Sequence, residues 1–208
     1  MADTLAIMKI SPVIPVVTIN SVEEGVAMAR DFHAAGLNII EITRRTPAGI
    51  DALKAIAQEV PDMCLGLGTV WTEQQAREAI DAGAQFLVSP AITDEVGGVC
   101  KDADLAYLPG AQTASEIAHL VRTGWTEIKL FPASVAGGPA AIKAFSAVFP
   151  QVSFCPTGGV SEDNANDYLS LPSVACVGGS WLAKPPATDN GDSPIKAAAE
   201  RAIKLGRS

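Results

Sequence analysis

One lysine of the chain lies inside an apolar segment that is typical of a strand buried on both faces of a parallel sheet. Lys129 is in the centre of Glu127–Phe131, which follows Gly124 and precedes Pro132. A buried ammonium without a partner is costly, so such an amine tends to lose its proton and becomes a nucleophile suited to carbonyl carbons. The alternative is a lysine at a strand end whose ammonium group reaches the solvent.

A carboxylate lies in a second apolar segment of the same kind. Glu41 is in the centre of Ile39–Thr43, and Arg45 follows the end of this segment. A carboxylate and a lysine that meet between strands can act as an acid–base and nucleophile pair. The other interpretation is an ion pair that only stabilises the fold. Arg45 could bind a carboxylate through its guanidinium group, and Thr69, at the end of another strand-like segment, could add a hydroxyl.

Paired glycines follow the last two strand-like segments. Gly158 and Gly159 come after Thr157, and Gly178–Gly179 precede Ser180. Glycines let backbone N–H groups approach an anion closely. Each pair alone is compatible with an ordinary turn, but the two pairs together favour a phosphate site. The chain has no GxxxxGK[ST] motif, so a nucleoside triphosphate is not indicated.

Strand-like and helix-like segments alternate along the chain, which is typical of parallel strands joined by helices. Helix ends at Gly36, Gly83 and Gly124 each lead into an apolar strand, at spacings of roughly 40 to 50 residues that fit two strand–helix units. The sequence therefore predicts an α/β fold: one (β/α)8 TIM barrel domain over residues 1–208, with a short amino-terminal segment. A doubly wound open sheet is the alternative, but Gly66–Gly68 lacks the third glycine of a GxGxxG motif.

Helix starts and strands are expected at definite positions. Ser21 with Glu24 and Thr113 with Glu116 fit the capping box, and Ser161 is expected to begin a helix. The eight expected strands are Val13–Thr18, Asn38–Thr43, Cys64–Thr69, Phe86–Pro90, Ala106–Pro109, Glu127–Phe131, Ser153–Thr157 and Val174–Gly179.

Bulk properties exclude several classes of partner. The formal net charge of -8 argues against a nucleic-acid partner, and no apolar run approaches the roughly 20 residues of a membrane span. Met1–Thr4 lacks the features of a signal peptide, and the four cysteines lack metal-ligand spacing, which favours free thiols in the cytoplasm. The two histidines, His33 and His119, are expected to have surface or packing roles.

A set of strand-end motifs spans nearly the whole chain and resembles one family. The motifs are Glu41-Ile42-Thr43-x-Arg45, Gly66-x-Gly68-Thr69-Val70, Ser89-Pro90, Leu108-Pro109-Gly110, Lys129-Leu130-Phe131-Pro132-Ala133, Phe154-x-Pro156-Thr157-Gly158-Gly159 and Val177-Gly178-Gly179-Ser180. Together they are similar to the 2-keto-3-deoxy-6-phosphogluconate (KDPG) aldolase and 4-hydroxy-2-oxoglutarate (KHG) aldolase family. The resemblance implies a class I aldolase on a (β/α)8 barrel, usually a homotrimer, that needs no metal or other cofactor.

The resemblance also implies a substrate and a set of roles. KDPG would be cleaved to pyruvate and glyceraldehyde 3-phosphate, and KHG to pyruvate and glyoxylate. Lys129 would form the Schiff base and Glu41 would carry protons. The implied substrate-binding residues are Arg45 and Thr69 for the carboxylate, Pro90 and Phe131 for the keto-acid pocket, and Thr157, Gly158, Gly159, Gly179 and Ser180 for the far end with its phosphate.

Some residues depart from the family pattern and leave alternatives open. Arg44 replaces an apolar residue and could compete with Arg45, and Thr18 stands where some relatives carry an arginine. One alternative is an aldolase for the galactonate-derived epimer of the substrate, and another is a phosphosugar-binding barrel without catalysis. A metal-dependent class II aldolase is disfavoured, because no histidine and carboxylate cluster has suitable spacing.

Overall fold

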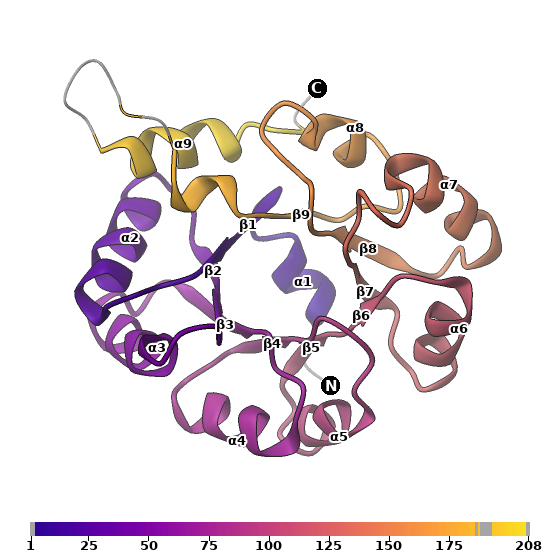
Figure 1. The fold of residues 1–208 in the computed structure, drawn as a ribbon, viewed down its shortest axis with the longest axis horizontal. Helices are drawn as coiled ribbons and strands as arrows, with labels where there is room; N and C mark the ends of the chain where they lie inside the picture. Colours follow the sequence, from indigo (N-terminus) through magenta and orange to yellow (C-terminus); the bar gives the residue numbers. More distant parts are fainter. Residues whose placement is uncertain (1–2, 186, 188–192, 207–208) are drawn as a thin grey trace.

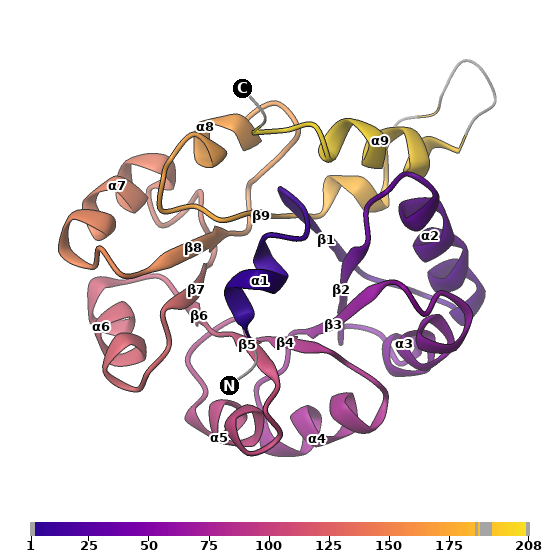
Figure 2. The ribbon, with the colours of Figure 1, turned by 180° about the vertical axis from the view of Figure 1, so that it is seen from behind.

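The computed structural model describes residues 3–185, 187 and 193–206, and these form an α/β fold with parallel strands. Figure 1 shows the strands arranged around a common centre, with most helices on the outside. From behind, in Figure 2, the short helix α1 (Thr4–Met8) lies across this centre. The strands are β1 (Val13–Val17), β2 (Ile39–Thr43), β3 (Cys64–Gly68), β4 (Phe86–Val88), β5 (Ala106–Leu108), β6 (Gly110–Ala111), β7 (Glu127–Leu130), β8 (Ser153–Pro156) and β9 (Val177–Gly179).

The strands form two parallel sheets, one in the order β5-β4-β3-β2-β1-β9 and one in the order β6-β7-β8. Parallel bridges join Phe154 to Val174 and Thr157 to Gly178, so β8 lies beside the segment that contains β9. At the opposite edges, the N–H of Lys129 donates to the carbonyl of Pro109, between β5 and β6 (2.9 Å). The two sheets therefore contact each other at both pairs of edges.

Each of the eight predicted strand segments contains an observed strand. The difference lies near Pro109, where the structure has two short strands, β5 and β6, although the sequence predicted one. Proline has no N–H to donate to a ladder, so it interrupts the strand. Gly110 follows directly, and a Cβ atom there would lie 2.6 Å from the carbonyl oxygen of Pro90, so only glycine fits this close approach.

Helices connect the strands and cover the outside of the sheets (Figure 1). They are α2 (Val22–Ala34), α3 (Ala48–Glu59), α4 (Glu73–Asp81), α5 (Asp94–Asp102), α6 (Ala114–Arg122), α7 (Gly138–Val148), α8 (Ala165–Leu169), the 3₁₀ helix η1 (Trp181–Ala183) and α9 (Pro194–Ala202). None of the helices in the described residues is long and apolar enough to cross a membrane.

The helix starts agree with the sequence at Ser21 and Thr113 and differ at Ser161. Thr113 and Glu116 form both hydrogen bonds of a capping box at α6. At α2, the Ser21 hydroxyl accepts from the N–H of Glu24, but the Glu24 carboxylate accepts from Asn20 one residue earlier, so the predicted box is incomplete. The helix expected at Ser161 begins at Ala165, because the residues from Ser161 onward form a turn around Asn164.

Candidate active site

Lys129 and Glu41 meet inside the fold. Nζ of Lys129, on β7, lies 3.3 Å from Oε1 of Glu41, on β2, and the two side chains are only 6% and 4% exposed. These strands belong to different sheets, so the contact crosses the interior. The Phe131 ring lies beside the amine, with its centroid 5.3 Å from Nζ. The pair therefore brings together an amine and a carboxylate, groups that can act as nucleophile and proton carrier, in surroundings that exclude most water.

A glycine on the neighbouring strand makes room for the carboxylate. Gly68, at the end of β3, has no side chain, and a Cβ atom there would overlap Glu41, 2.7 Å from its Cδ atom. Thr69 follows with φ of 65°, a left-handed conformation in which a β-branched residue is strained. Such strained turns are often found at functional sites. Here the turn lies directly beside the catalytic candidate Glu41.

An inner cavity of about 140 Å³ lies at this end of the strands. It brings together six of the residues that the family resemblance assigned to substrate binding: Arg45, Phe131, Thr157, Gly158, Gly159 and Ser180. Val16, Val160 and Gly178 complete its lining. Phe131 therefore connects the cavity to Lys129, and the glycine turns lie in the same cavity.

The remaining predicted substrate-binding residues, Thr69, Pro90 and Gly179, are not in the lining of this cavity. Gly179 is buried behind it, because the Trp181 ring fills the space of its missing side chain; the lining residue is Gly178. Thr69 is half-buried, and its hydroxyl forms no hydrogen bond within the described residues. The backbone of Pro90 packs against Gly110.

Arg44 and Thr18, two residues that depart from the family pattern, each have a partner within the protein. The guanidinium group of Arg44 donates to Glu78 on α4 (2.8 Å), so this arginine is held by a carboxylate. The hydroxyl of Thr18 lies 2.9 Å from that of Thr43. Arg45, by contrast, is exposed and forms no ion pair or hydrogen bond within residues 3–185, 187 and 193–206. Arg45 is the guanidinium group available to a ligand.

Two polar residues that the sequence reasoning missed shape the glycine turn. The Asn164 side chain accepts from the N–H of Ser161 and donates to the carbonyl of Gly159 (2.8 and 3.0 Å). The side chain of Ser134, in the loop after β7, lies where a side chain on Gly159 would be. An asparagine three residues after a serine is a turn signal that the sequence does carry. The contact with Ser134 depends on the fold and has no local signal.

The buried thiol of Cys176 is a poor nucleophile. Cys155, on β8, is the register partner of Lys129. A hydrogen bond with Cys155, together with burial, raises the pKa of the Cys176 thiol well above its ordinary value. Both thiols are free. The amine of Lys129 is therefore the group suited to attack.

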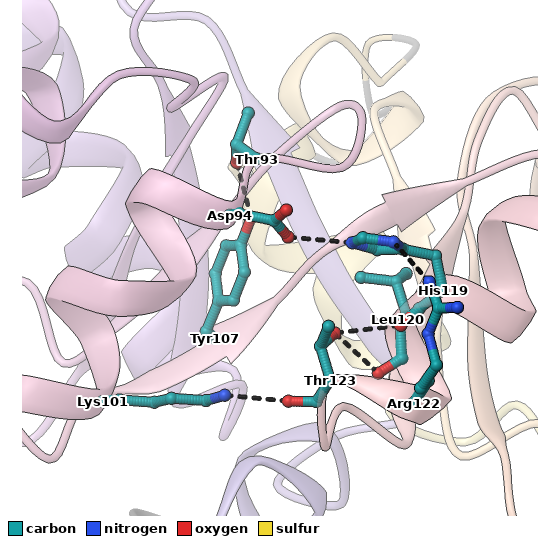
Figure 3. Close-up of polar contacts among 8 residues, drawn as sticks. All are labelled: Thr93, Asp94, Lys101, Tyr107, His119, Leu120, Arg122 and Thr123. Carbon is teal, nitrogen blue, oxygen red and sulfur yellow. Dashed lines mark hydrogen bonds and ion pairs between the residues drawn. The ribbon is translucent and has the colours of Figure 1, made fainter.

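The histidines take no part in this arrangement. His119 lies on the surface between α5 and α6, where Nε2 is 2.9 Å from Oδ1 of Asp94 (Figure 3). His33 is exposed, with Nδ1 2.8 Å from the side chain of Asn38. Within the described residues, no group of three or more His, Cys, Asp or Glu side chains could hold a metal ion.

Comparisons with known proteins agree with this geometry. The family model for KDPG and KHG aldolase matches residues 5–196. The KHG/KDPG aldolase of Escherichia coli (strain K12) is 42% identical over 202 residues, covering 97% of this chain and 92% of the relative. The crystal structure of the 2-keto-3-deoxy-6-phosphogluconate aldolase of Zymomonas mobilis ZM4 with 3-phosphoglycerate is similar at a TM-score of 0.91 and 37% identity, covering 98% and 96% of the two chains.

A second solved structure bears on the chemistry. The KDPG aldolase from Legionella pneumophila, with pyruvate captured at low pH as a covalent carbinolamine intermediate, has a TM-score of 0.86 and 37% identity, covering 99% of this chain and 97% of that chain. The fold, the buried lysine and these matches define an aldolase, which is a carbon–carbon lyase. The chain belongs to the KDPG and KHG aldolase family.

Proposed function

We propose that this chain is a class I aldolase that cleaves KDPG to pyruvate and glyceraldehyde 3-phosphate, and also KHG to pyruvate and glyoxylate. The observation that carries the proposal is the buried contact of 3.3 Å between Lys129 and Glu41 beside the inner cavity. The family membership and the carbinolamine in the Legionella relative support it.

The reaction begins when the amine of Lys129 adds, through its lone pair, to the 2-keto carbon of the substrate. Glu41 delivers a proton to the oxygen of the carbinolamine, directly or through water, and a water molecule leaves to give a protonated imine. The imine accepts the electron pair of the bond between carbons 3 and 4 as this bond breaks. Glu41 takes the proton of the 4-hydroxyl group, and the aldehyde departs.

The second half restores the enzyme. The enamine left on Lys129 takes a proton at carbon 3, and water then hydrolyses the imine to release pyruvate. The water lost in the first half is used in the second, so the reaction has no net water and needs no oxidant, metal or other cofactor. Glu41 is suited to all these transfers because it contacts the amine on which each intermediate forms.

The proposed substrate contacts combine residues in the lining of the inner cavity with Thr69, Pro90 and Gly179, which lie outside that lining. The guanidinium group of Arg45 has no partner within the described part of the chain, and we assign it, with Thr69, to the carboxylate of the keto acid. Phe131 and Pro90 would contact the pyruvyl part. The far end with its phosphate would lie against the glycine turns, and the proposed residues are Thr157, Gly158, Gly159, Gly179 and Ser180.

We also propose that the strands close into a single barrel. The contacts at both pairs of sheet edges support closure of the strands into one (β/α)8 barrel, and we treat residues 1–208 as a single domain. The family resemblance supports a homotrimer, which light scattering would test as a mass about three times the 21.5 kDa of the chain. Four free cysteines support a reducing, cytoplasmic location.

Trapping with borohydride tests the proposed function. Incubation with pyruvate and sodium borohydride should add a reduced three-carbon unit to Lys129, detected by peptide mapping. The matched control is Lys129→Met, which should give no adduct. An adduct on another residue, or no adduct at all, would refute the assignment and favour a phosphosugar-binding protein without catalysis. Relative rates on the gluconate- and galactonate-derived phosphates would then identify the preferred epimer.

A further inference from the structure

An outer cavity of about 310 Å³ adjoins the inner one at the mouth of the site. The two cavities share three lining residues, Val16, Arg45 and Ser180. The outer cavity extends past Ser180 to residues that the proposed function does not use: Thr18, Asn20, Ala183 and Lys184. A ligand whose far end lies at Ser180 therefore reaches the boundary between the two cavities.

The charged groups in the lining of the outer cavity are both cations. Arg45 and Lys184 line it, and neither side chain forms an ion pair or hydrogen bond with any residue in the described ranges. Two polar neighbours are already engaged, since Thr18 contacts Thr43 and the Asn20 side chain donates to Glu24. Glu24 lies behind Asn20 and is not part of the lining. Two cations that have no partner among the described residues create a positive potential at the mouth, which favours an anion.

Lys184 is placed by a short structured segment that begins at the glycine turn. The helix η1 follows Ser180 directly, its Trp181 ring fills the space beside Gly179, and its Leu182 is buried. The N–H of Lys184 donates to the carbonyl of Trp181 (3.3 Å). The backbone of Lys184 is therefore held against the same strand end that carries Ser180, while its side chain stays free to reach a ligand.

We propose that Lys184 is a specificity-determining residue that binds the dianionic far end of the substrate from the outer cavity, opposite the glycine turns. This inference rests on the proposed function. A phosphate monoester carries a charge of about −1.5 to −2 at neutral pH, so its interaction with an added ammonium is stronger than that of a neutral or singly charged group. In KHG the terminal carboxylate is bonded directly to the carbon that carries the hydroxyl group. The KHG molecule is therefore too short to reach past Ser180. Lys184 therefore selects phosphorylated substrates over short ones.

The test compares substrates and matched variants. For Lys184→Gln we expect kcat/KM on KDPG to fall about tenfold, mainly through KM, with kcat/KM on KHG within about twofold of the parent. Lys184→Arg retains the charge and should restore most of the loss. Lys54→Gln removes the same charge from an exposed position on α3 and should change neither substrate. Inhibition by inorganic phosphate should weaken about tenfold in Lys184→Gln alone, as a direct measure of anion binding.

The outcomes separate this inference from the proposed function. The role of Lys184 would be overturned if Lys184→Gln lowered kcat/KM equally on KDPG and KHG, or lowered it on neither. An unchanged inhibition constant for phosphate would overturn it as well. Trapping of pyruvate on Lys129 should be the same in Lys184→Gln and in the parent, since pyruvate has no far end. If the parent itself forms no adduct, the proposed function fails, and direct binding of inorganic phosphate to the parent and to Lys184→Gln, measured by titration calorimetry, still decides whether Lys184 binds an anion.

Discussion

The carboxylate of Glu41 lies in the space that a side chain on Gly68 would occupy. The two residues are on neighbouring parallel strands, β2 and β3, with Glu41 in register with Gly66 and Thr43 in register with Gly68. A Cβ atom on Gly68 would be 2.7 Å from Cδ of Glu41 and 2.8 Å from Cγ. Gly68 therefore sets the position from which the carboxylate meets Lys129.

Replacing Gly68 should lower the activity of the site although neither Glu41 nor Lys129 is mutated. In Gly68→Ala the added methyl group displaces the carboxylate, and we expect turnover to fall by about 10²-fold, the usual scale for a misplaced acid or base. The crowding should also lower the free energy of unfolding by about 1 to 3 kcal/mol. Steady-state kinetics and urea unfolding measure the two effects.

A second glycine supplies the control. Gly98 lies exposed on α5, and a Cβ atom there would meet nothing within 4 Å. Gly98→Ala should therefore keep full activity and stabilise the protein by about 0.5 to 1 kcal/mol, because alanine favours a helix. Unchanged turnover in Gly68→Ala would show that the glycine does not position the carboxylate.

The role of Glu41 itself is tested by Glu41→Gln. The amide keeps the size of the carboxylate but cannot carry a proton, so we expect turnover to fall by about 10²-fold or more. The control Glu127→Gln removes a carboxylate from the start of the same strand as Lys129, where the Glu127 carboxylate accepts from the hydroxyl of Thr126, and should retain activity. Wild-type rates in Glu41→Gln would leave the contact with Lys129 as a structural ion pair.

Much of the fold and of the candidate site could be predicted from the sequence, because it depends on local patterns. Apolar runs bounded by glycines predict the eight strand positions, and an ionisable residue inside such a run is noticeable in Glu41 and Lys129. The contact of 3.3 Å between them follows once the strands are placed around one centre. The interruption at Pro109 could also be anticipated, since proline cannot continue a ladder.

Contacts between distant segments could not be read in the same way. The close approach of Ser134 to Gly159 depends on how the loops after β7 and β8 meet. The pairing of Arg44 with Glu78 likewise joins a strand end to the next helix but one. Such partners have no fixed spacing along the chain, so the sequence gives candidates and the fold selects among them.

The position of the phosphate is tested at Ser180. Ser180→Asp places a negative charge at the boundary of the two cavities, and like-charge repulsion should lower kcat/KM on KDPG at least tenfold. KHG lacks a group at this distance, so its kcat/KM should change by less than about threefold. Ser180→Ala removes the hydroxyl without adding a charge and should cause a smaller loss. If Ser180→Asp lowers kcat/KM on KDPG and on KHG to a comparable extent, the phosphate does not bind at Ser180.

Burial of Cys100 makes the stability of the fold sensitive to alkaline pH. Burial raises the pKa of the Cys100 thiol to about 12, whereas a thiol in the unfolded chain ionises near its ordinary pKa of about 8.5. Between these values the unfolded chain releases a proton that the folded protein retains, so the free energy of unfolding falls as pH rises. The contribution is fully present below about pH 8.5 and is lost as pH approaches 12.

The variant Cys100→Ala isolates this effect. Loss of the buried sulfur should lower stability at every pH by about 1 to 2 kcal/mol, which is a packing effect. Above pH 9, however, the decline of the variant should be shallower than that of the parent by up to about 1.4 kcal/mol per pH unit, because one ionisation has been removed. Urea unfolding at pH 7, 8, 9 and 10 measures both terms. Parallel curves for the two proteins would mean that the Cys100 thiol ionises alike in the folded and unfolded chains, and that its burial does not shift its pKa.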